Sequence, residues 1–308
     1  MPRPVIIDCD PGVDDAVALL LAFAAPDALD LLGITTVAGN VGAALTARNA
    51  CVVREIAGRE DVPVFAGAAA PLFAEPIAAE HFHGESGLGD LAFTQPKKGA
   101  EAESAVAFLI RTLSAAAPRS VDVAITGPMT NVALALRAAP EIAQGIREIV
   151  VMGGARSEGG NITASAEYNI YADPHAAEIV FRSGLPVVAF GLDVTHQVRT
   201  NPARLARLAA LKSRQAQAAH ALLRFGERVE LELAKREGAP LHDQSTIAYL
   251  IAPELFETVE CAIAVETSSP LTRGHTAVEF RINAPTPVRW ATRANAEGVF
   301  DLLERRLA

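Results

Sequence analysis

The chain has 308 residues, of which 50% are hydrophobic, and a formal net charge of −9, so we expect one large domain with an ample core. The acidic balance and the lack of a dense Lys/Arg run argue against a surface for nucleic acid or an anionic membrane, which requires clustered basic residues. Three cysteines, Cys9, Cys51 and Cys261, are widely spaced without a C-x-x-C pair, which is typical of a reducing compartment without a disulfide framework.

Strand-like and helix-like segments alternate through the first 190 residues. Short apolar runs bounded by turn residues predict strands at 5–7, 29–38, 62–66, 121–125, 149–152 and 187–190. Longer segments predict helices at 16–21, 43–57, 105–117, 131–138 and from Pro174 onward, with Asp173 as the N-cap of the last. The alternation predicts an α/β fold, a single large domain with a mostly parallel, Rossmann-like mixed central sheet flanked by helices.

The pattern changes after residue 200. Helix is expected over most of 202–237 and again at 243–251, followed by strands in antiparallel or edge positions at 261–265, 276–281 and 288–292, and by a last helix at 295–307. Residues 1–308 are therefore expected to form one domain. It has an inserted loop near 71–99, which we expect at the functional site because long loops in compact domains are usually functional or disordered, and a mainly helical segment at 202–252.

Residues 8–15, D-C-D-P-G-V-D-D, place Asp8 and Asp10 at the end of the first strand and Asp14 and Asp15 at the start of the first helix. The carboxyl end of a parallel strand is where α/β proteins bind their ligands. Helix capping explains an Asp at a helix N-terminus, but it does not explain Asp8 and Asp10. Carboxylates packed this closely repel one another, so we expect either that some stay protonated or that a cation holds them.

Other polar groups follow predicted strands or lie in loops. They are Asn40 after 37–39, Thr126 before Gly127 and Pro128, H-F-H-G-E-S-G at 81–87, G-G-N at 159–161, A-E-Y-N at 166–169, and His242 with Asp243 before a helix. Taken singly, each is explained by an ordinary turn or cap, because Asn suits turns and Asp suits helix N-termini.

In their order and spacing these segments resemble the calcium-dependent nucleoside hydrolases, the inosine/uridine-preferring family that cleaves ribonucleosides to base and ribose. The resemblance is carried by D-C-D-P-G-V-D-D-A at 8–16, V-A-G-N at 37–40, T-G-P at 126–128, M-G-G at 152–154, G-N at 160–161, A-E-Y-N at 166–169, D-P at 173–174 and H-D at 242–243. It covers most of the chain. It implies an N-ribosyl hydrolase of the glycosidase class that attacks the N-glycosidic bond with a calcium-bound water and serves nucleoside salvage.

By this resemblance, Asp10, Asp15, Asp243 and the backbone carbonyl of Thr126 are the Ca²⁺ ligands, an all-oxygen set that suits this hard cation. Asp10 is also implied as the general base that takes a proton from the water. The substrate-binding residues that the resemblance implies are Asp14, Asn40, His83, Met152, Asn161, Glu167, Tyr168 and Asn169.

The leaving base gains from protonation, and His242 is the candidate general acid, with His83 on the long loop as a second candidate. The alternative is that His242 orients Asp243 or contacts the base without donating a proton. Both interpretations stay open at this point.

One departure from the family pattern leaves the choice between purine and pyrimidine nucleosides open. Some relatives carry a tyrosine over the base on the helix that corresponds to 222–235, but here that segment has Phe225 as its one aromatic residue.

Two other functions match parts of the sequence. Asp8 and Asp10 also match the D-x-D at the end of the first strand in haloacid-dehalogenase-like phosphohydrolases, which bind Mg²⁺. That class normally has Thr or Val two residues after the second Asp, where this chain has Gly12, and it would leave the Asn and Glu sugar contacts unexplained. The second alternative is a non-catalytic calcium-dependent nucleoside- or ribose-binding protein, against which the complete ligand set and His242 argue.

Partners and location follow from the same observations. The N-terminus lacks the basic-then-apolar layout of a signal peptide, and the apolar run at 16–25 is too short to span a bilayer. We therefore expect a cytoplasmic protein whose partner is a small-molecule nucleoside, with no nucleic acid and no membrane. The resemblance suggests a homotetramer, with a homodimer as the alternative.

Overall fold

The computed structural model describes residues 1–93, 95–283 and 286–308. Its first strand, β1 (Arg3–Cys9), lies inside a large central sheet. Its apolar run Val5–Ile7 is almost fully buried, and it pairs in parallel with β2 on one side and β4 on the other. A strand covered on both faces needs such a continuous apolar run. The sequence of β1 therefore already indicates its central position.

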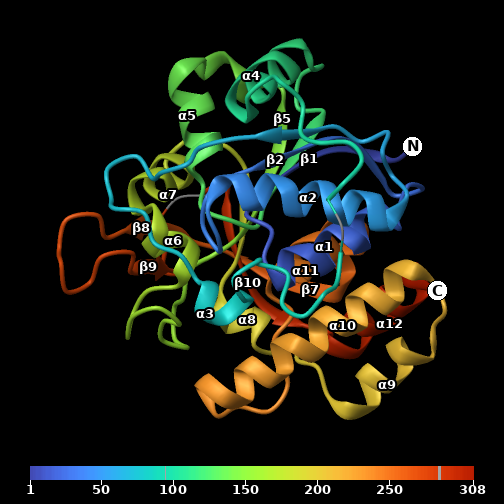
Figure 1. Ribbon diagram of the computed structural model, residues 1–308. Helices are drawn as coiled ribbons and strands as arrows, with labels where there is room; N and C mark the ends of the chain where they lie inside the picture. The colour runs from blue at the N-terminus through green and yellow to red at the C-terminus, as the bar shows by residue number, and fades with distance from the viewer. Residues whose placement is uncertain (94, 284–285) are drawn as a thin grey trace.

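Eight strands form the main sheet in the order β3-β2-β1-β4-β5-β6-β10-β7 (Figure 1). The strands after β1 are β2 (Leu29–Thr36), β3 (Val64–Ala66), β4 (Val121–Ile125), β5 (Ile146–Met152), β6 (Val187–Phe190), β7 (Phe256–Glu260) and β10 (Val288–Ala294). All neighbours are parallel except β10 and β7. This confirms the predicted α/β fold with a mostly parallel, mixed central sheet.

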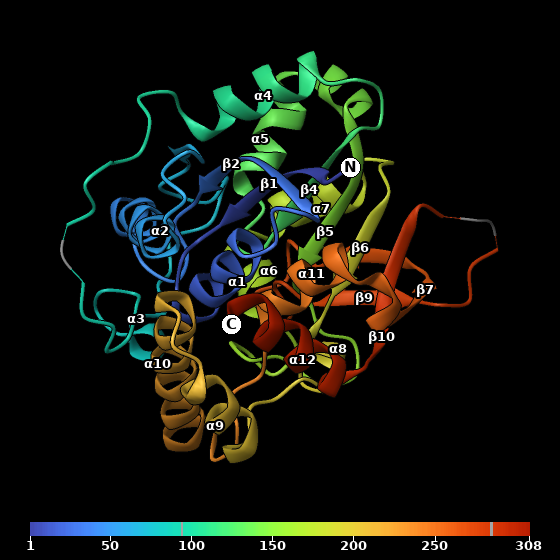
Figure 2. The ribbon, with the colours of Figure 1, turned by 90° about the vertical axis from the view of Figure 1, so that its right-hand side faces the viewer.

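Two layers of helices cover the sheet, as Figures 1 and 2 show. One layer packs around α1 and contains α1 (Val13–Phe23), α2 (Ala43–Ala57), α10 (Arg214–Val229), α11 (His242–Ile251) and α12 (Ala296–Leu307). The other contains α4 (Ala105–Ala115), α5 (Thr130–Ala138) and α7 (Pro174–Phe181). The remaining helices are α3 (Glu80–His83), α6 (Tyr168–Ala172), α8 (Leu192–Thr195) and α9 (Pro202–Ala210). Two large hydrophobic clusters, one for each layer, form most of the core, and a small third cluster joins Met152, Ala155 and Leu192.

The C-terminal third differs from the prediction in three places. The helix expected over 202–237 is divided, because Ser213 caps a new helix by accepting a hydrogen bond from Ala216 N–H at 3.0 Å. The strand β10 was expected to be antiparallel or at an edge: it is antiparallel to β7, but it lies inside the sheet, where its other neighbour, β6, is parallel to it. The edge strand beside β10 is β7, whose partly exposed sequence F-E-T-V-E gave no strand signal.

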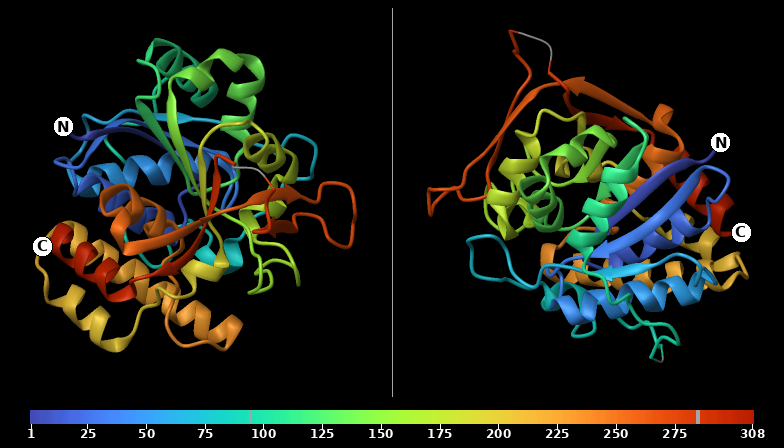
Figure 3. Two further views of the ribbon diagram at one scale, coloured as in Figure 1. Left: turned by 180° about the vertical axis from the view of Figure 1, so that it is seen from behind. Right: turned by 90° about the horizontal axis from the view of Figure 1, so that it is seen from above.

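The strands predicted at 261–265 and 276–281 are confirmed as β8 (Ala262–Val265) and β9 (Thr276–Glu279), which form a separate antiparallel ribbon. This ribbon extends from one side of the molecule, and both chain termini lie on the opposite side (Figures 1 and 3). In the part of the chain that the structure describes, none of the helices combines the length and the apolar character needed to cross a membrane. Thr94, within the predicted loop near 71–99, lies outside the described residues.

Candidate active site

A cavity of about 570 Å³ lies at the carboxyl ends of the central strands. Its walls come from segments far apart in the sequence. The lining residues are Asp14, Asn40, Ala79, His81, Phe82, His83, Thr126, Met152, Glu158, Gly160, Asn161, Ile162, Glu167, Tyr168, Asn169, His196, Glu230, Leu233, Arg236, His242 and Asp243. This is the position at which parallel α/β sheets bind ligands.

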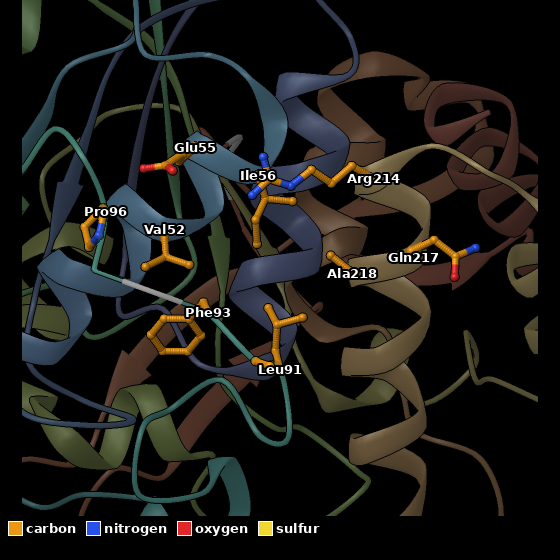
Figure 4. A pocket seen from close by; sticks show the side chains of 10 residues that line it. Val52, Glu55, Ile56, Leu91, Phe93, Pro96, Arg214, Gln217 and Ala218 are labelled. Carbon is orange, nitrogen blue, oxygen red and sulfur yellow. The ribbon is translucent and has the colours of Figure 1, made fainter.

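A second cavity, of about 280 Å³, lies between α2, α10, residues 91–93 and Pro96 (Figure 4). Its walls are mostly apolar, with Val52, Ile56, Leu91 and Phe93 among them. The charged side chains that line it are Glu55 and Arg214, and these two do not form a cluster of catalytic or metal-binding groups. The larger cavity is therefore the candidate active site.

The floor of this cavity is an acidic cluster. One carboxylate oxygen from each of Asp14, Asp15 and Asp243 lies within 4.8 Å of the other two. Asp14 and Asp15 begin α1, and Asp243 begins α11, so two helix N-termini meet at this point. The positive ends of both helix dipoles favour the negative charges gathered there.

The Asp10 carboxylate is buried beside this cluster. Its Oδ2 accepts a hydrogen bond from Asn40 N–H at 2.7 Å, whereas its Oδ1 is buried without a hydrogen-bond partner among the described residues. A Cβ atom at Gly39 or at Gly127 would overlap this carboxylate. The glycines of the segments V-A-G-N and T-G-P therefore provide the space that Asp10 occupies, a role that the sequence analysis did not assign.

Asp15 is held by a dense set of hydrogen bonds. Its Oδ1 accepts from the Thr126 hydroxyl at 2.7 Å, and its Oδ2 accepts from Gly12 N–H at 3.1 Å and from Asn40 Nδ2 at 2.9 Å. Gly12 is the N-cap of α1, so Asp15 also caps its own helix. Capping and participation in the cluster are thus combined in one side chain.

Burial and mutual repulsion disfavour the ionised forms of these groups. Burial, with the charge of Asp14 adding to it, raises the pKa of Asp15 to about 6. Burial together with the nearby charge of Asp15 holds the pKa of Asp10 well above its usual range. Burial and the charges of Asp14 and Asp15 do the same to the pKa of Asp243. Each of these effects would be relieved by a cation.

The donor set fits a hard divalent cation. Within residues 1–93, 95–283 and 286–308, the one basic side chain within ion-pair distance of the cluster is His83, 3.9 Å from Asp14. The free Oδ1 of Asp10 and the carboxylates of the cluster supply the several oxygen ligands that such an ion requires. Asp14 belongs to this cluster by geometry, although the sequence analysis expected it to contact the substrate.

The wall above the cluster presents groups that suit a polyhydroxylated ligand. Glu167 is buried, and its carboxylate accepts from the backbone N–H groups of Gly154 and Asn169, both at 3.0 Å, and of Ile170 at 3.3 Å. Burial raises the pKa of Glu167 to about 7. The Asn169 amide donates to the carbonyl oxygens of Thr126 at 2.8 Å and Met152 at 3.2 Å, which joins the ends of β4 and β5.

Both predicted histidines lie in the cavity with one ring nitrogen already engaged. His83 Nδ1 accepts from Val13 N–H at 3.1 Å, and burial lowers the pKa of His83 to about 4. His242 Nδ1 lies 2.8 Å from the Thr195 hydroxyl, and burial lowers the pKa of His242 to about 3. These surroundings favour neutral rings near neutral pH.

The structure brings the predicted site residues together. All eight predicted substrate-binding residues line the cavity, as do Thr126, His242 and Asp243, while Asp10 and Asp15 are buried beneath its floor. The outer part of the cavity is lined by residues that no sequence motif indicated: Glu158, Ile162, His196, Glu230, Leu233 and Arg236. These residues lie in loops and helix ends without a motif to mark them. Phe225 does not line the cavity, and its ring lies against Gly89 instead.

Comparison with known proteins gives consistent matches over the whole chain. A family model described as inosine-uridine preferring nucleoside hydrolase matches residues 5–301. The chain is 44% identical to the pyrimidine-specific ribonucleoside hydrolase RihA of Salmonella gallinarum, covering 100% of this chain and 99% of that protein. It is 45% identical to an uncharacterized protein of Schizosaccharomyces pombe, covering 90% of this chain and 89% of that protein.

Solved structures agree with these matches. A plant nucleoside hydrolase superposes with a TM-score of 0.93 at 32% identity, covering 100% of this chain and 99% of that chain. A purine-preferring ribonucleoside hydrolase from Gardnerella vaginalis superposes with a TM-score of 0.92 at 32% identity, covering 99% of this chain and 98% of that chain.

The space around Asp10 can be tested by Gly127→Ala. Because the added Cβ overlaps the Asp10 carboxylate, we expect this variant to bind Ca²⁺ at least about tenfold more weakly, a loss of about 1.4 kcal/mol, measured by titration calorimetry. Gly42→Ala is the matched control, because a Cβ there meets open space, and it should leave Ca²⁺ affinity unchanged. Equal affinities for the two variants would remove the proposed role of Gly127.

The cluster also predicts how cation binding depends on pH. Carboxylates must lose their protons to bind a cation, so protons and the cation compete for the same oxygens. Because the pKa of Asp15 is raised to about 6, this competition at Asp15 occurs near pH 6. Saturating Ca²⁺, at about 100 times its Kd, should stabilise the fold by about 2.7 kcal/mol near neutral pH. The increase in Tm caused by the same Ca²⁺ concentration should shrink as the pH falls from about 7.5 to about 5. An increase that does not change over this range would contradict the assignment.

Proposed function

The chain belongs to the inosine-uridine preferring nucleoside hydrolase family, and we propose that it is a calcium-dependent hydrolase that cleaves ribonucleosides to free base and ribose. The observation that carries this proposal is the cavity with carboxylates on its floor and sugar-binding amides and carboxylates on its wall. The family assignment replaces the phosphohydrolase alternative.

We propose that Asp10, Asp15, Asp243 and the carbonyl of Thr126 hold the ion, in keeping with the resemblance, and that the adjacent Asp14 is available to the ribose. These residues would hold a Ca²⁺ ion beside the ribose, where such an ion would supply the Lewis acidity that lowers the pKa of a water. The protein side of this arrangement is preorganised, because Asp15 and Asn40 are already fixed by hydrogen bonds.

Asp10 is proposed as the general base. Its Oδ1 is buried without a hydrogen-bond partner in the described chain, so this oxygen is available to take a proton from water. A water that Asp10 deprotonates while it attacks the anomeric carbon approaches the face opposite the base. The proposal therefore includes inversion of configuration at that carbon.

Glu167 is proposed to stabilise the sugar as positive charge develops on it. Breaking the N-glycosidic bond gives the ribosyl group oxocarbenium character, and a fixed carboxylate nearby favours that state. Three backbone N–H groups hold the Glu167 carboxylate, so its position costs little reorganisation during the reaction. Asn161 and Asn169 offer amide groups to the sugar hydroxyls from the same wall.

Of the two roles expected for His242, contact with the base without proton donation is better supported. The ring is buried, its Nδ1 is paired with a neutral hydroxyl, and its lowered pKa favours the uncharged form. His83 has its Nδ1 occupied by a backbone N–H and is proposed to contact the substrate.

We propose pyrimidine ribonucleosides as the preferred substrates, because the relative named pyrimidine-specific matches the whole chain at 44% identity. A cytoplasmic homotetramer, with a homodimer as the alternative, is our proposal for location and assembly. Light scattering after size-exclusion chromatography distinguishes the two assemblies.

The substrate proposal predicts the outcome of a panel of uridine, cytidine, inosine, adenosine and guanosine, followed by reducing-sugar release. We expect turnover with Ca²⁺, loss of at least about 99% of it after treatment with a chelator, and recovery when Ca²⁺ is restored. Uridine and cytidine should have the highest kcat/KM. Turnover that is insensitive to the chelator would contradict the calcium proposal, and a purine preference would contradict only the choice of base.

Asp10→Asn tests the general base with a side chain of the same shape. An amide cannot accept the proton, so kcat should fall by about 10² to 10⁴. Asp30→Asn, on the exposed side of β2, is the matched control and should retain wild-type kcat. Calcium affinity is measured for both variants, so that loss of the ion is separated from loss of the base. A kcat within threefold of wild type, with Ca²⁺ bound, would remove Asp10 from the mechanism.

A further inference from the structure

The peptide group between Gly39 and Asn40 forms a hydrogen bond at each of its two polar atoms. The Asn40 N–H donates to Oδ2 of Asp10 at 2.7 Å. The Gly39 carbonyl oxygen accepts from the hydroxyl of Tyr168 at 2.9 Å. Because the N–H and C=O bonds of a trans peptide point in opposite directions, Asp10 and Tyr168 hold this group from opposite sides.

Tyr168 comes from a firmly held part of the cavity wall. It begins α6, and its backbone N–H donates to Oδ1 of Asn161 at 2.8 Å. The next residue, Asn169, donates to the carbonyl oxygens of Thr126 and Met152 at the ends of β4 and β5. The helix α6 is therefore fastened to the sheet. The Tyr168 hydroxyl links it to the turn after β2, 129 residues earlier in the chain.

The Asp10 carboxylate depends on this turn for its orientation. The torsion that rotates a carboxylate has only a broad intrinsic preference, so the hydrogen bond to Oδ2 decides where Oδ1 lies. Oδ1 itself is buried without a hydrogen-bond partner in the described chain. A Cβ atom at Gly39 would overlap Oδ2, so the carboxylate also packs directly against the turn. A shift of the Gly39–Asn40 peptide group would therefore move the carboxylate with it.

We propose that the Tyr168 hydroxyl positions Asp10 for its role as general base, acting through the Gly39–Asn40 peptide group. This inference rests on the proposed function. A phenol keeps its proton near neutral pH and can donate it to a carbonyl oxygen. Such donation polarises the peptide group and strengthens the hydrogen bond at its N–H end. The hydroxyl thus reinforces the bond that directs Oδ1 of Asp10 toward the attacking water.

The ring and the hydroxyl of Tyr168 have separate roles in this arrangement. The residue lines the cavity, where its ring is available to the substrate. Its hydroxyl proton is already engaged by the Gly39 carbonyl oxygen and is not free to bind a sugar hydroxyl. Tyr168 is therefore a positioning residue, because its hydroxyl acts on the reaction through Asp10.

Tyr168→Phe removes the hydroxyl and keeps the ring. With saturating Ca²⁺, we expect kcat for uridine to fall by about three- to tenfold, the range that follows from the loss of one hydrogen bond. KM should change by less than about twofold, because the ring still lines the cavity. Tyr171→Phe is the matched control, since Tyr171 lies on the same helix but is not among the residues that line the cavity. It should change neither constant.

A double-mutant cycle separates an effect through Asp10 from any other effect. The variant Asp10→Asn has no general base to position, so adding Tyr168→Phe to it should lower kcat by less than about twofold. If the hydroxyl acted on the substrate directly, the losses caused by the two substitutions would multiply.

The peptide group also gives a readout that needs no turnover. Glycine is followed by asparagine at two places, Gly39–Asn40 and Gly160–Asn161. Protein labelled with ¹³C at glycine carbonyls and ¹⁵N at asparagine therefore gives two amide signals in a spectrum that correlates the two nuclei. In Tyr168→Phe the Asn40 amide proton should move upfield, because its bond to the carboxylate weakens. The Asn161 signal should move less, since its N–H donates to the Ala166 carbonyl oxygen. We expect the same change with Ca²⁺ and after chelation.

Several results would overturn the inference and leave the proposed function in place. They are an unchanged kcat in Tyr168→Phe, a rise in KM at constant kcat, losses that multiply in the double-mutant cycle, or an Asn40 amide signal that does not move. If the wild-type protein hydrolyses no ribonucleoside of the panel with Ca²⁺ present, the proposed function itself fails, and the positioning role fails with it.

Discussion

The structure depends on one electrostatic constraint, which is the burial of several carboxylates at one edge of the sheet without a neighbouring Lys or Arg among the described residues. Asp10, Asp14 and Asp15 come from the first 15 residues, and Asp243 comes from a helix near the other end of the chain. Bringing like charges together in a buried site costs free energy, and burial raises their pKa values. A divalent cation turns this repulsion into attraction, so one bound ion would link both ends of the polypeptide.

The rest of the fold supplies the means to hold such a cluster in place. Two helix N-termini point at it, Asn40 joins the backbone of Asp10 to the carboxylate of Asp15, and Gln244 on α11 donates to the Asp14 carbonyl at 2.9 Å. Glycines flank Asp10 because a side chain at either position would occupy the space of its carboxylate. The motif residues are thus explained by three separate needs: charge, hydrogen bonding and space.

The inner and outer parts of the cavity differ in the kinds of side chain that line them. Its inner part is built from strand ends, which the parallel sheet fixes, and it carries carboxylates and amides suited to a metal and a sugar. Its outer part is built from α3, the loop at 158–162, the end of α8 and the π-helical turn Glu230–Ala234. It carries imidazoles, apolar groups and the charged side chains of Glu158, Glu230 and Arg236. Loops on a rigid scaffold are where specificity is most easily varied. The names of two relatives differ in the preferred base: one is called pyrimidine-specific and the other purine-preferring.

The sequence alone determined the elements whose signal is local. Strands such as β4 and β6 and the helix α2 were predicted with their observed bounds, because apolar runs and helix periodicity act over a few residues. The acidic motif and the motifs at the strand ends indicated the inner part of the site. Only the tertiary structure decided the position of β10, the edge strand β7, and the meeting of His196 with Glu158 and His242. The strand positions depend on pairing between distant segments, which no local pattern encodes. The surroundings of His196 depend on packing in the same way, because the residues around a loop histidine come from segments that only folding brings together.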